Sequence, residues 1–121
     1  FELASNMYGA EFLPQISIIP KVDLVITHGG NNTTTESVHF GKPMIVLPLF
    51  WDQYDNAQRV HEKGHGVRLA TYHFKDKELT NAIEKLTTDT ALLAKLSKIG
   101  EQVRSRKGIE EAATKIEALA K

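Results

Sequence analysis

The sequence predicts an α/β fold in which a parallel β-sheet is flanked by helices and followed by a helical carboxyl-terminal tail. Its apolar runs are short, β-branched and nearly continuous, as expected of parallel strands buried on both faces. Each run precedes a polar, helix-forming stretch, and this alternation favours right-handed βαβ crossovers. With 121 residues, the chain is expected to form a single domain, residues 1–121, since domains commonly hold about 100–200 residues.

The elements follow from composition and from glycine and proline positions. Strands are predicted over residues 10–14, 22–27, 43–50 and 66–70, whereas residues 15–19 are too short to assign by periodicity. A helix after the second strand ends at Gly41 and Pro43, and the next is stopped by Gly64. Further helices are predicted over residues 52–64, 75–86, 89 to about 107, and 109 to the end.

Charge and composition exclude several classes of protein. Lys and Arg total 15, as do Asp and Glu, which argues against a nucleic-acid or membrane-surface protein with a basic excess. The absence of cysteine excludes a disulfide framework and a thiolate metal site. No apolar stretch approaches the roughly 18 residues of a spanning helix, and no signal-peptide pattern opens the chain. Because the chain begins with Phe, we expect a piece of a longer protein.

Glycines and polar residues follow the second predicted strand. Gly29 and Gly30 permit unusual backbone dihedrals and close approach of another group. Ligands of open parallel sheets bind beyond the carboxyl ends of the strands, and a helix starting there offers unpaired N–H groups and the positive end of its dipole. His28 could add a donor, and Asn32 and Thr33 could add polar contacts. The turn is therefore a candidate anion site.

A purely structural explanation of this turn competes with the anion site. Thr33 and Glu36 match a capping box, in which both side chains satisfy donors of their own helix. The Walker phosphate loop is excluded because no lysine lies between residues 22 and 42. The dinucleotide fingerprint G-x-G-x-x-G is not matched either, since Gly29 and Gly30 are adjacent, and an NAD site is therefore disfavoured.

HEKGH, residues 61–65, fits the zinc-protease pattern H-E-x-x-H. That pattern requires both histidines on one face of a continuous helix, whereas Gly64 and Gly66 predict that the helix ends between them. Arg68 and Thr71 occupy the glycine and third-histidine positions of the longer motif. We interpret the match as a coincidence and predict no metal site.

Four spaced motifs occur in order along the chain: FLPQ at 12–15, THGGNNTTTE at 27–36, GKPMIVLPLFWDQYDN at 41–56 and KGHGVRL at 63–69. Together they resemble the donor-binding, carboxyl-terminal half of the UDP-glycosyltransferase family, and the helical tail fits the rest of that half. The interval from His28 to Asp52 equals the family's own, and the short connection from Gln15 to His28 is similar to that of bacterial macrolide-type enzymes. The resemblance implies the GT-B architecture, with a Rossmann-like nucleotide-sugar-binding domain.

The resemblance also implies which residues hold the nucleotide. Phe12 stands where the family usually has a tryptophan stacked on the uracil ring, and Gln15 would lie near the nucleoside. Glu36 would accept hydrogen bonds from the ribose hydroxyls. The diphosphate would be held by the backbone near Gly30 and by the side chains of His28, Asn32 and Thr33.

By the same resemblance, Asp52 and Gln53 would bind hydroxyls of the transferred sugar. The implied reaction moves a glucose-like hexose from a UDP-sugar to a hydroxyl of a small lipophilic acceptor, with inversion at the anomeric carbon. A helix amino terminus and His28 would stabilise the departing diphosphate, so that neither a metal nor another cofactor is expected.

The family's general base, a histidine, lies on the amino-terminal acceptor domain. We therefore assign no catalytic residue here, and expect this chain to lack that domain and the first strands of its own. Alone it should be inactive. The alternative is a nucleotide-binding subunit of a two-chain glycosyltransferase, and an NAD-binding domain is a weaker third reading. A cytoplasmic location is expected because a glycan on the sequons at Asn31 or Asn32 would block the phosphate site, although a membrane-anchored lumenal form stays open.

Overall fold

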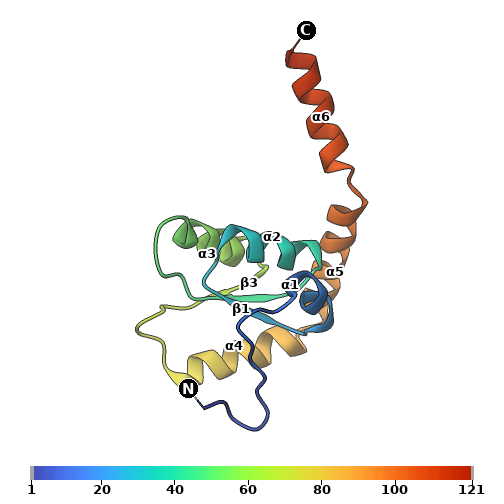
Figure 1. Cartoon of the computed structure of the whole chain (residues 1–121). Coiled ribbons are helices and arrows are strands. Elements are labelled where there is room, and N and C mark those ends of the chain that lie inside the picture. The colour runs from blue at the N-terminus through green and yellow to red at the C-terminus, as the bar shows by residue number, and fades with distance from the viewer. Residues whose placement is uncertain (1, 121) are drawn as a thin grey trace.

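A computed structural model describes residues 2–120 of the chain. Its centre is a three-stranded parallel sheet with strand order β1-β2-β3 (Figure 1). The register places Ile26 opposite Ile45, and Ile45 opposite Val67. The strands are β1 (Val25–Thr27), β2 (Met44–Val46) and β3 (Gly66–Arg68). The predicted parallel sheet is thus confirmed, with shorter ladders than the apolar runs indicated.

Helices cover both faces of the sheet. The crossover helices α2 (Asn31–His39) and α3 (Asp52–Glu62) lie on one face, and α4 (Asp76–Thr88) lies on the other (Figure 1). The side chains of β2 alternate between two cores, because successive residues of a strand point to opposite faces. Met44 and Val46 pack with Ala57 and Val60 of α3, while Ile45 packs with Ala82 and Leu86 of α4.

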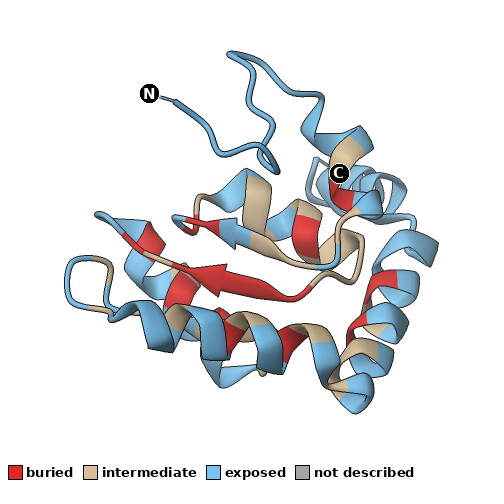
Figure 2. Cartoon of the chain, turned by 90° about the horizontal axis from the view of Figure 1, so that it is seen from below, coloured by how far each residue is buried: buried red, intermediate tan, exposed pale blue. Residues whose placement is uncertain are grey.

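The burial of β2 explains its continuous apolar run. Met44, Ile45 and Val46 are all fully buried, and β2 is the central red arrow in Figure 2. A strand covered on both faces has no solvent side on which polar residues would recur. The strand is therefore apolar throughout, as predicted, and it fixes the carboxyl edge of the sheet on which the turns lie.

The strand predicted over residues 10–14 is wrong. These residues adopt irregular structure and are exposed, and no other strand lies beside them in the described part of the chain. An apolar pattern specifies a strand only where a ladder partner exists. Residues 15–21, left unassigned by periodicity, form the short helix α1 (Gln15–Ile18) and the 3₁₀ turn η1 (Ile19–Lys21).

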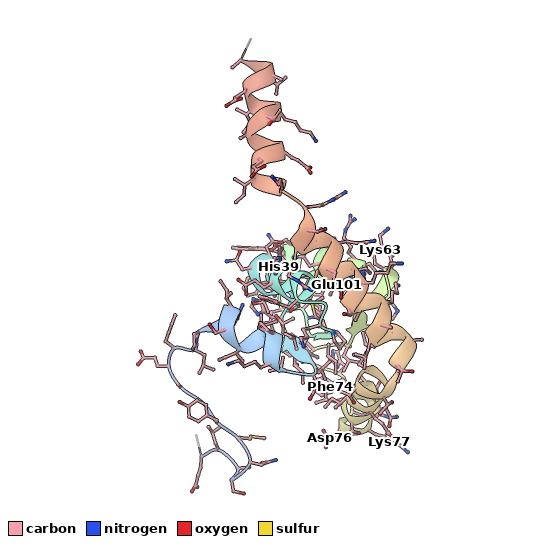
Figure 3. The ribbon with its side chains drawn as sticks, turned by 90° about the vertical axis from the view of Figure 1, so that its right-hand side faces the viewer. His39, Lys63, Phe74, Asp76, Lys77 and Glu101 are labelled. Carbon is pink, nitrogen blue, oxygen red and sulfur yellow. The ribbon has the colours of Figure 1, made fainter. Side chains whose placement is uncertain are left out.

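The helical tail is confirmed. Helix α5 (Thr90–Ser105) is capped by the Asp89 side chain, which accepts from Leu92 N at 2.9 Å. It runs beside the end of α2, where Arg104 donates to the His39 carbonyl oxygen; Figure 3 labels His39 and Glu101 on these two helices. Helix α6 (Gly108–Leu119) projects away from the body (Figures 1 and 3). Within residues 2–120, no helix is both long and apolar enough to cross a membrane.

Candidate functional site

The turn after β1 is fixed by a glycine with an unusual backbone. Gly29 has φ +91°, and its N–H donates to Thr27 Oγ1 at 3.2 Å. A Cβ on Gly29 would lie 2.8 Å from Val46 Cγ1 and 3.2 Å from the Gln53 carbonyl oxygen. Glycine is needed here both for its left-handed conformation and for the close packing of the turn against β2 and α3.

Helix α2 begins directly in this turn. Gly30 is the N-cap residue, with extended backbone, and its carbonyl oxygen accepts from Thr34 N at 3.0 Å. The helix has no side-chain cap among the described residues. The capping box is therefore wrong, because the helix starts two residues before Thr33. The first N–H groups of α2 and the positive end of its dipole remain available to an anion.

The imidazole of His28 lies over this helix start. A Cβ built on Gly30 would lie 2.8 Å from His28 Nε2, which places that nitrogen beside the N-cap backbone. The His28 side chain is exposed. An exposed ring nitrogen beside unpaired backbone donors provides a second type of group that can donate to an anionic ligand.

Three predicted nucleotide-binding side chains meet between α1 and α2. Gln15 Nε2 donates to Thr33 Oγ1 at 3.1 Å and to Glu36 Oε2 at 2.5 Å. The amide thus joins α1 to α2 across a long stretch of sequence. It occupies one carboxylate oxygen of Glu36 and orients the group, while a carboxylate keeps further acceptor positions for a ligand.

Two adjoining hollows lie over these groups, and both are lined by Gln15, His28 and Thr33. One, about 490 Å³, continues along Gly30, Asn31 and Asn32. The other, about 530 Å³, runs beside the carboxyl ends of β1 and β2, and its further lining residues are Ile26, Thr27, Leu47, Leu49 and Thr71. The structure thus gathers six predicted residues in one place, namely Gln15, His28, Gly30, Asn32, Thr33 and Glu36.

The remaining three predicted residues, Phe12, Asp52 and Gln53, lie outside this group. Phe12 is 84% exposed on the irregular amino-terminal segment. Asp52 is exposed at the start of α3. Gln53 is 5% exposed, and its Oε1 accepts from Leu49 N at 2.9 Å and from Phe50 N at 3.2 Å. The side-chain oxygen of Gln53 therefore stabilises the loop before α3, a role that the sequence analysis did not predict.

Asn56 supports the glycine turn of the candidate site, a role that the sequence analysis did not identify. Its Nδ2 donates to the Gly29 carbonyl oxygen at 2.8 Å and to Asn31 Oδ1 at 2.9 Å. This single amide holds α3 against both sides of the glycine turn. Asn56 occurs at the end of the quoted motif, but only the crossover packing of α2 against α3 reveals its partners.

Among residues 2–120, the HEKGH segment included, no three His, Asp or Glu residues are grouped so that they could hold a metal ion. Helix α3 ends at Glu62 and Gly64 turns with φ +66°, as predicted. His65 is half-buried between α3 and β3. Burial, followed by the charges of Lys95 and Lys63, lowers the pKa of His65 below its usual 6.5.

Comparison with known proteins shows the family. The family described as "UDP-glucoronosyl and UDP-glucosyl transferase" matches residues 2–114. The chain is 33% identical over 120 residues to the NDP-glycosyltransferase YjiC of Bacillus subtilis (strain 168), covering 99% of this chain and 31% of that protein. It is 36% identical over 110 residues to a sterol 3-beta-glucosyltransferase of Pichia angusta, covering 91% of this chain and 9% of that protein.

A solved structure gives the same result for the fold. The crystal structure of the glycotransferase of kitacinnamycin superimposes with a TM-score of 0.87 at 30% identity, covering 98% of this chain and 30% of that one. The chain therefore belongs to the UDP-glucuronosyl and UDP-glucosyl transferase family and has the carboxyl-terminal fold of a GT-B glycosyltransferase. It spans about a third or less of the length of these proteins.

Proposed function

We propose that this chain is the donor-binding part of an inverting glycosyltransferase that moves a glucose-like hexose from a UDP-sugar to a hydroxyl of a small lipophilic acceptor. The observation that carries the proposal is the convergence of Gln15, Thr33, Glu36 and His28 on the uncapped start of α2. The names of the relatives, an NDP-glycosyltransferase and a sterol glucosyltransferase, support the donor and acceptor classes.

In this proposal the nucleoside lies along α1 and α2. The ribose hydroxyls donate to Glu36, whose carboxylate is held by the Gln15 amide. Phe12 covers the base after the exposed amino-terminal segment closes over it. The diphosphate oxygens accept from the first N–H groups of α2, from His28, and from the side chains of Asn32 and Thr33.

The transfer step places demands on the same groups. The acceptor oxygen bonds to the anomeric carbon on the face opposite the diphosphate, the bond from that carbon to the diphosphate oxygen breaks, and the acceptor proton passes to a base outside this chain. Negative charge grows on the diphosphate as that bond breaks. The α2 dipole and His28 are already in place to stabilise it, and we propose that the reaction proceeds without a metal or other cofactor.

Asp52 and Gln53 are proposed to contact the sugar hydroxyls. Asp52 is exposed in the first turn of α3, and the Asn56 contacts hold that helix against the glycine turn. The oxygen of Gln53 is already used by the loop, so that its amide nitrogen is the group left for the sugar.

Titration calorimetry with UDP tests the proposal, with NAD as the control nucleotide and circular dichroism as the check on folding. UDP should bind, NAD should not compete, and His28→Ala and Glu36→Ala should each weaken UDP binding while the fold is kept. Transfer by the protein at its natural length should survive a chelator. Failure of UDP to bind to the folded parent protein would overturn the proposal, and so would UDP affinities of both variants equal to that of the parent.

The alternative is a nucleotide-binding subunit of a two-chain glycosyltransferase, without activity alone. UDP binding would be the same in both cases. Sugar transfer would separate them: a single natural chain would transfer the hexose unaided, whereas a subunit would transfer it only after its partner chain is added.

A further inference from the structure

Trp51 has a backbone conformation that its side chain disfavours. Its φ is 52° and its ψ is −133°, and it is the one non-glycine residue of positive φ in the described chain. This region is almost restricted to glycine, and a bulky residue persists there only when the surrounding structure imposes it. Such outliers concentrate at functional sites.

The loop around Trp51 is held by the first turn of α3. The buried Gln53 side chain accepts from Leu49 N and Phe50 N, and the Trp51 carbonyl oxygen accepts from Tyr54 N at 3.2 Å. These hydrogen bonds fix both sides of the strained residue. The backbone of Trp51 is therefore set before any ligand arrives, which lowers the cost of ordering this residue on binding.

The indole ring of Trp51 does not pack into the protein core. Trp51 is 84% exposed, and its indole contacts the Phe50 ring edge-on, with centroids 5.2 Å apart. Phe50 is itself 51% exposed. The strained conformation of Trp51 therefore does not bury its side chain against residues 2–120. It instead exposes an apolar, flat surface on the residue that precedes Asp52.

A hexose has the matching chemistry. Its ring presents C–H groups on its faces and hydroxyls around its rim, and binding sites for such ligands combine aromatic surface with a few placed polar groups. The exposed ring of Trp51 and the exposed carboxylate of Asp52 supply one group of each kind on consecutive residues. A nucleoside diphosphate without the hexose lacks the group that would occupy this position.

We propose that Trp51 stacks on the hexose of the nucleotide-sugar donor, with Phe50 supporting the indole, and that it contributes to the preference for the sugar. The inference rests on the proposed function, because the donor must lie along α2 for its sugar to reach the start of α3. It adds a specificity-determining residue to a subsite for which the sequence motif supplied only polar groups.

The chain provides its own probe, since Trp51 is its single tryptophan. Indole fluorescence and its quenching by acrylamide should be followed during titrations with UDP and with UDP-glucose. If the protein at its natural length is used, any further tryptophans are first replaced by phenylalanine. UDP-glucose should change the emission and shield Trp51 from acrylamide. UDP should bind with little effect on either signal.

Three variants separate binding from stability. Trp51→Gly should lower affinity for UDP-glucose about fivefold, as expected for loss of some tens of Å² of apolar contact, and leave UDP affinity unchanged. It should also unfold at or above the parent temperature, since glycine relieves the strain. Trp51→Ala should lose the same affinity without that relief, and Trp51→Phe should restore most of it.

The outcomes distinguish this inference from the proposed function. UDP-glucose and UDP that bind equally and leave Trp51 equally accessible would overturn the stacking while the nucleotide site stands. Shielding by the lipophilic acceptor, without shielding by UDP-glucose, would also overturn it. If neither nucleotide binds to the folded protein, the proposed function fails and this inference fails with it.

Discussion

Gln15 shows how one side chain assembles the site at the residue scale. It lies on a different helix from its two partners, Thr33 and Glu36, and its amide holds both. An exposed hydrogen bond of this kind adds little to stability, because water can replace it. The hydrogen bond instead orients the Glu36 carboxylate, which is proposed to bind the ribose, before the ligand binds.

Gln15→Ala should therefore weaken UDP binding without destabilising the chain. Without the Gln15 amide, the Glu36 carboxylate is no longer oriented. We expect this to lower the affinity for UDP roughly tenfold, which corresponds to about 1.4 kcal/mol. Calorimetry with UDP measures this change, and Gln102→Ala, an exposed glutamine on α5, is the matched control. An unchanged affinity in Gln15→Ala would show that Glu36 does not require its partner.

His65 makes stability depend on pH. Burial, Lys95 and Lys63 lower its pKa in the folded chain below the usual 6.5. The unfolded chain then binds more protons than the folded chain as pH falls through 6.5, so the free energy of unfolding should fall there and be recovered above it. Denaturant titrations at several pH values measure this slope.

Two substitutions, one at His65 and one at its neighbour Lys95, test the cause of this pH dependence. His65→Gln should flatten the slope near pH 6.5, and Lys95→Gln should flatten it in part, because desolvation would remain. A slope that both variants leave intact would assign the pH dependence to other groups.

At the scale of the element, glycine decides how closely α2 and α5 pack. Gly41 has φ +65°, and a Cβ there would lie 2.6 Å from the Leu96 carbonyl oxygen. Gly100 of α5 faces it: a Cβ on Gly100 would lie 2.8 Å from Gly41 N. Two glycines thus let the end of α2 meet the backbone of α5 directly.

Gly41→Ala should destabilise the chain by about 1–3 kcal/mol, the usual cost of forcing extra volume into a packed contact. Urea unfolding measures the change. Gly108→Ala is the control, because a Cβ there meets no described atom within 4 Å. Equal stability of Gly41→Ala and the parent chain would mean that α5 shifts away at no cost.

Most elements could be predicted from the sequence because their signals are local. The apolar run of β2 reports burial on both faces, and Gly64 reports the end of α3. Residues 10–14 failed because a strand needs a partner that an apolar pattern does not specify. The length of each ladder was also overestimated, since pairing depends on neighbours and not on hydropathy.

The arrangement of the candidate site, whose function stays a prediction, was predictable from local patterns only in part. Residues in the turn, such as His28 and Thr33, could be found because glycines and polar residues after a strand mark the carboxyl edge of a sheet. The capping box failed because the observed N-cap, Gly30, lies three residues before Thr33. Asn56 and the strained Trp51 depend on how α3 packs and turns, which no local pattern encodes.

At the scale of the whole molecule, the last helix is independent of the body. No residue of α6 is buried; Ile109 is 89% exposed and Leu119 is 88% exposed. Figure 1 shows it extending beyond the end of α5. The folded core thus comprises the sheet and the helices up to α5.

Ending the chain at Arg106 should therefore lower the helical circular dichroism signal but change the thermal midpoint by no more than about 2 °C. A destabilisation of about 1 kcal/mol would shift the midpoint of a domain this small by more than that. The same truncation should leave UDP binding unchanged, since the hollows are lined by residues of the first 71. A midpoint that drops by about 5 °C or more would show that α6 packs on the body in solution.

The central claim is that the glycine turn before α2 holds the diphosphate of a nucleotide sugar. The most direct measurement is an amide NMR titration of the folded chain with UDP. The account predicts that the largest shifts occur at the amides of residues 28–33 and at Glu36, where the uncapped helix start lies. Shifts concentrated instead around Arg68 and Tyr72, which line a separate hollow beside α3, would contradict it.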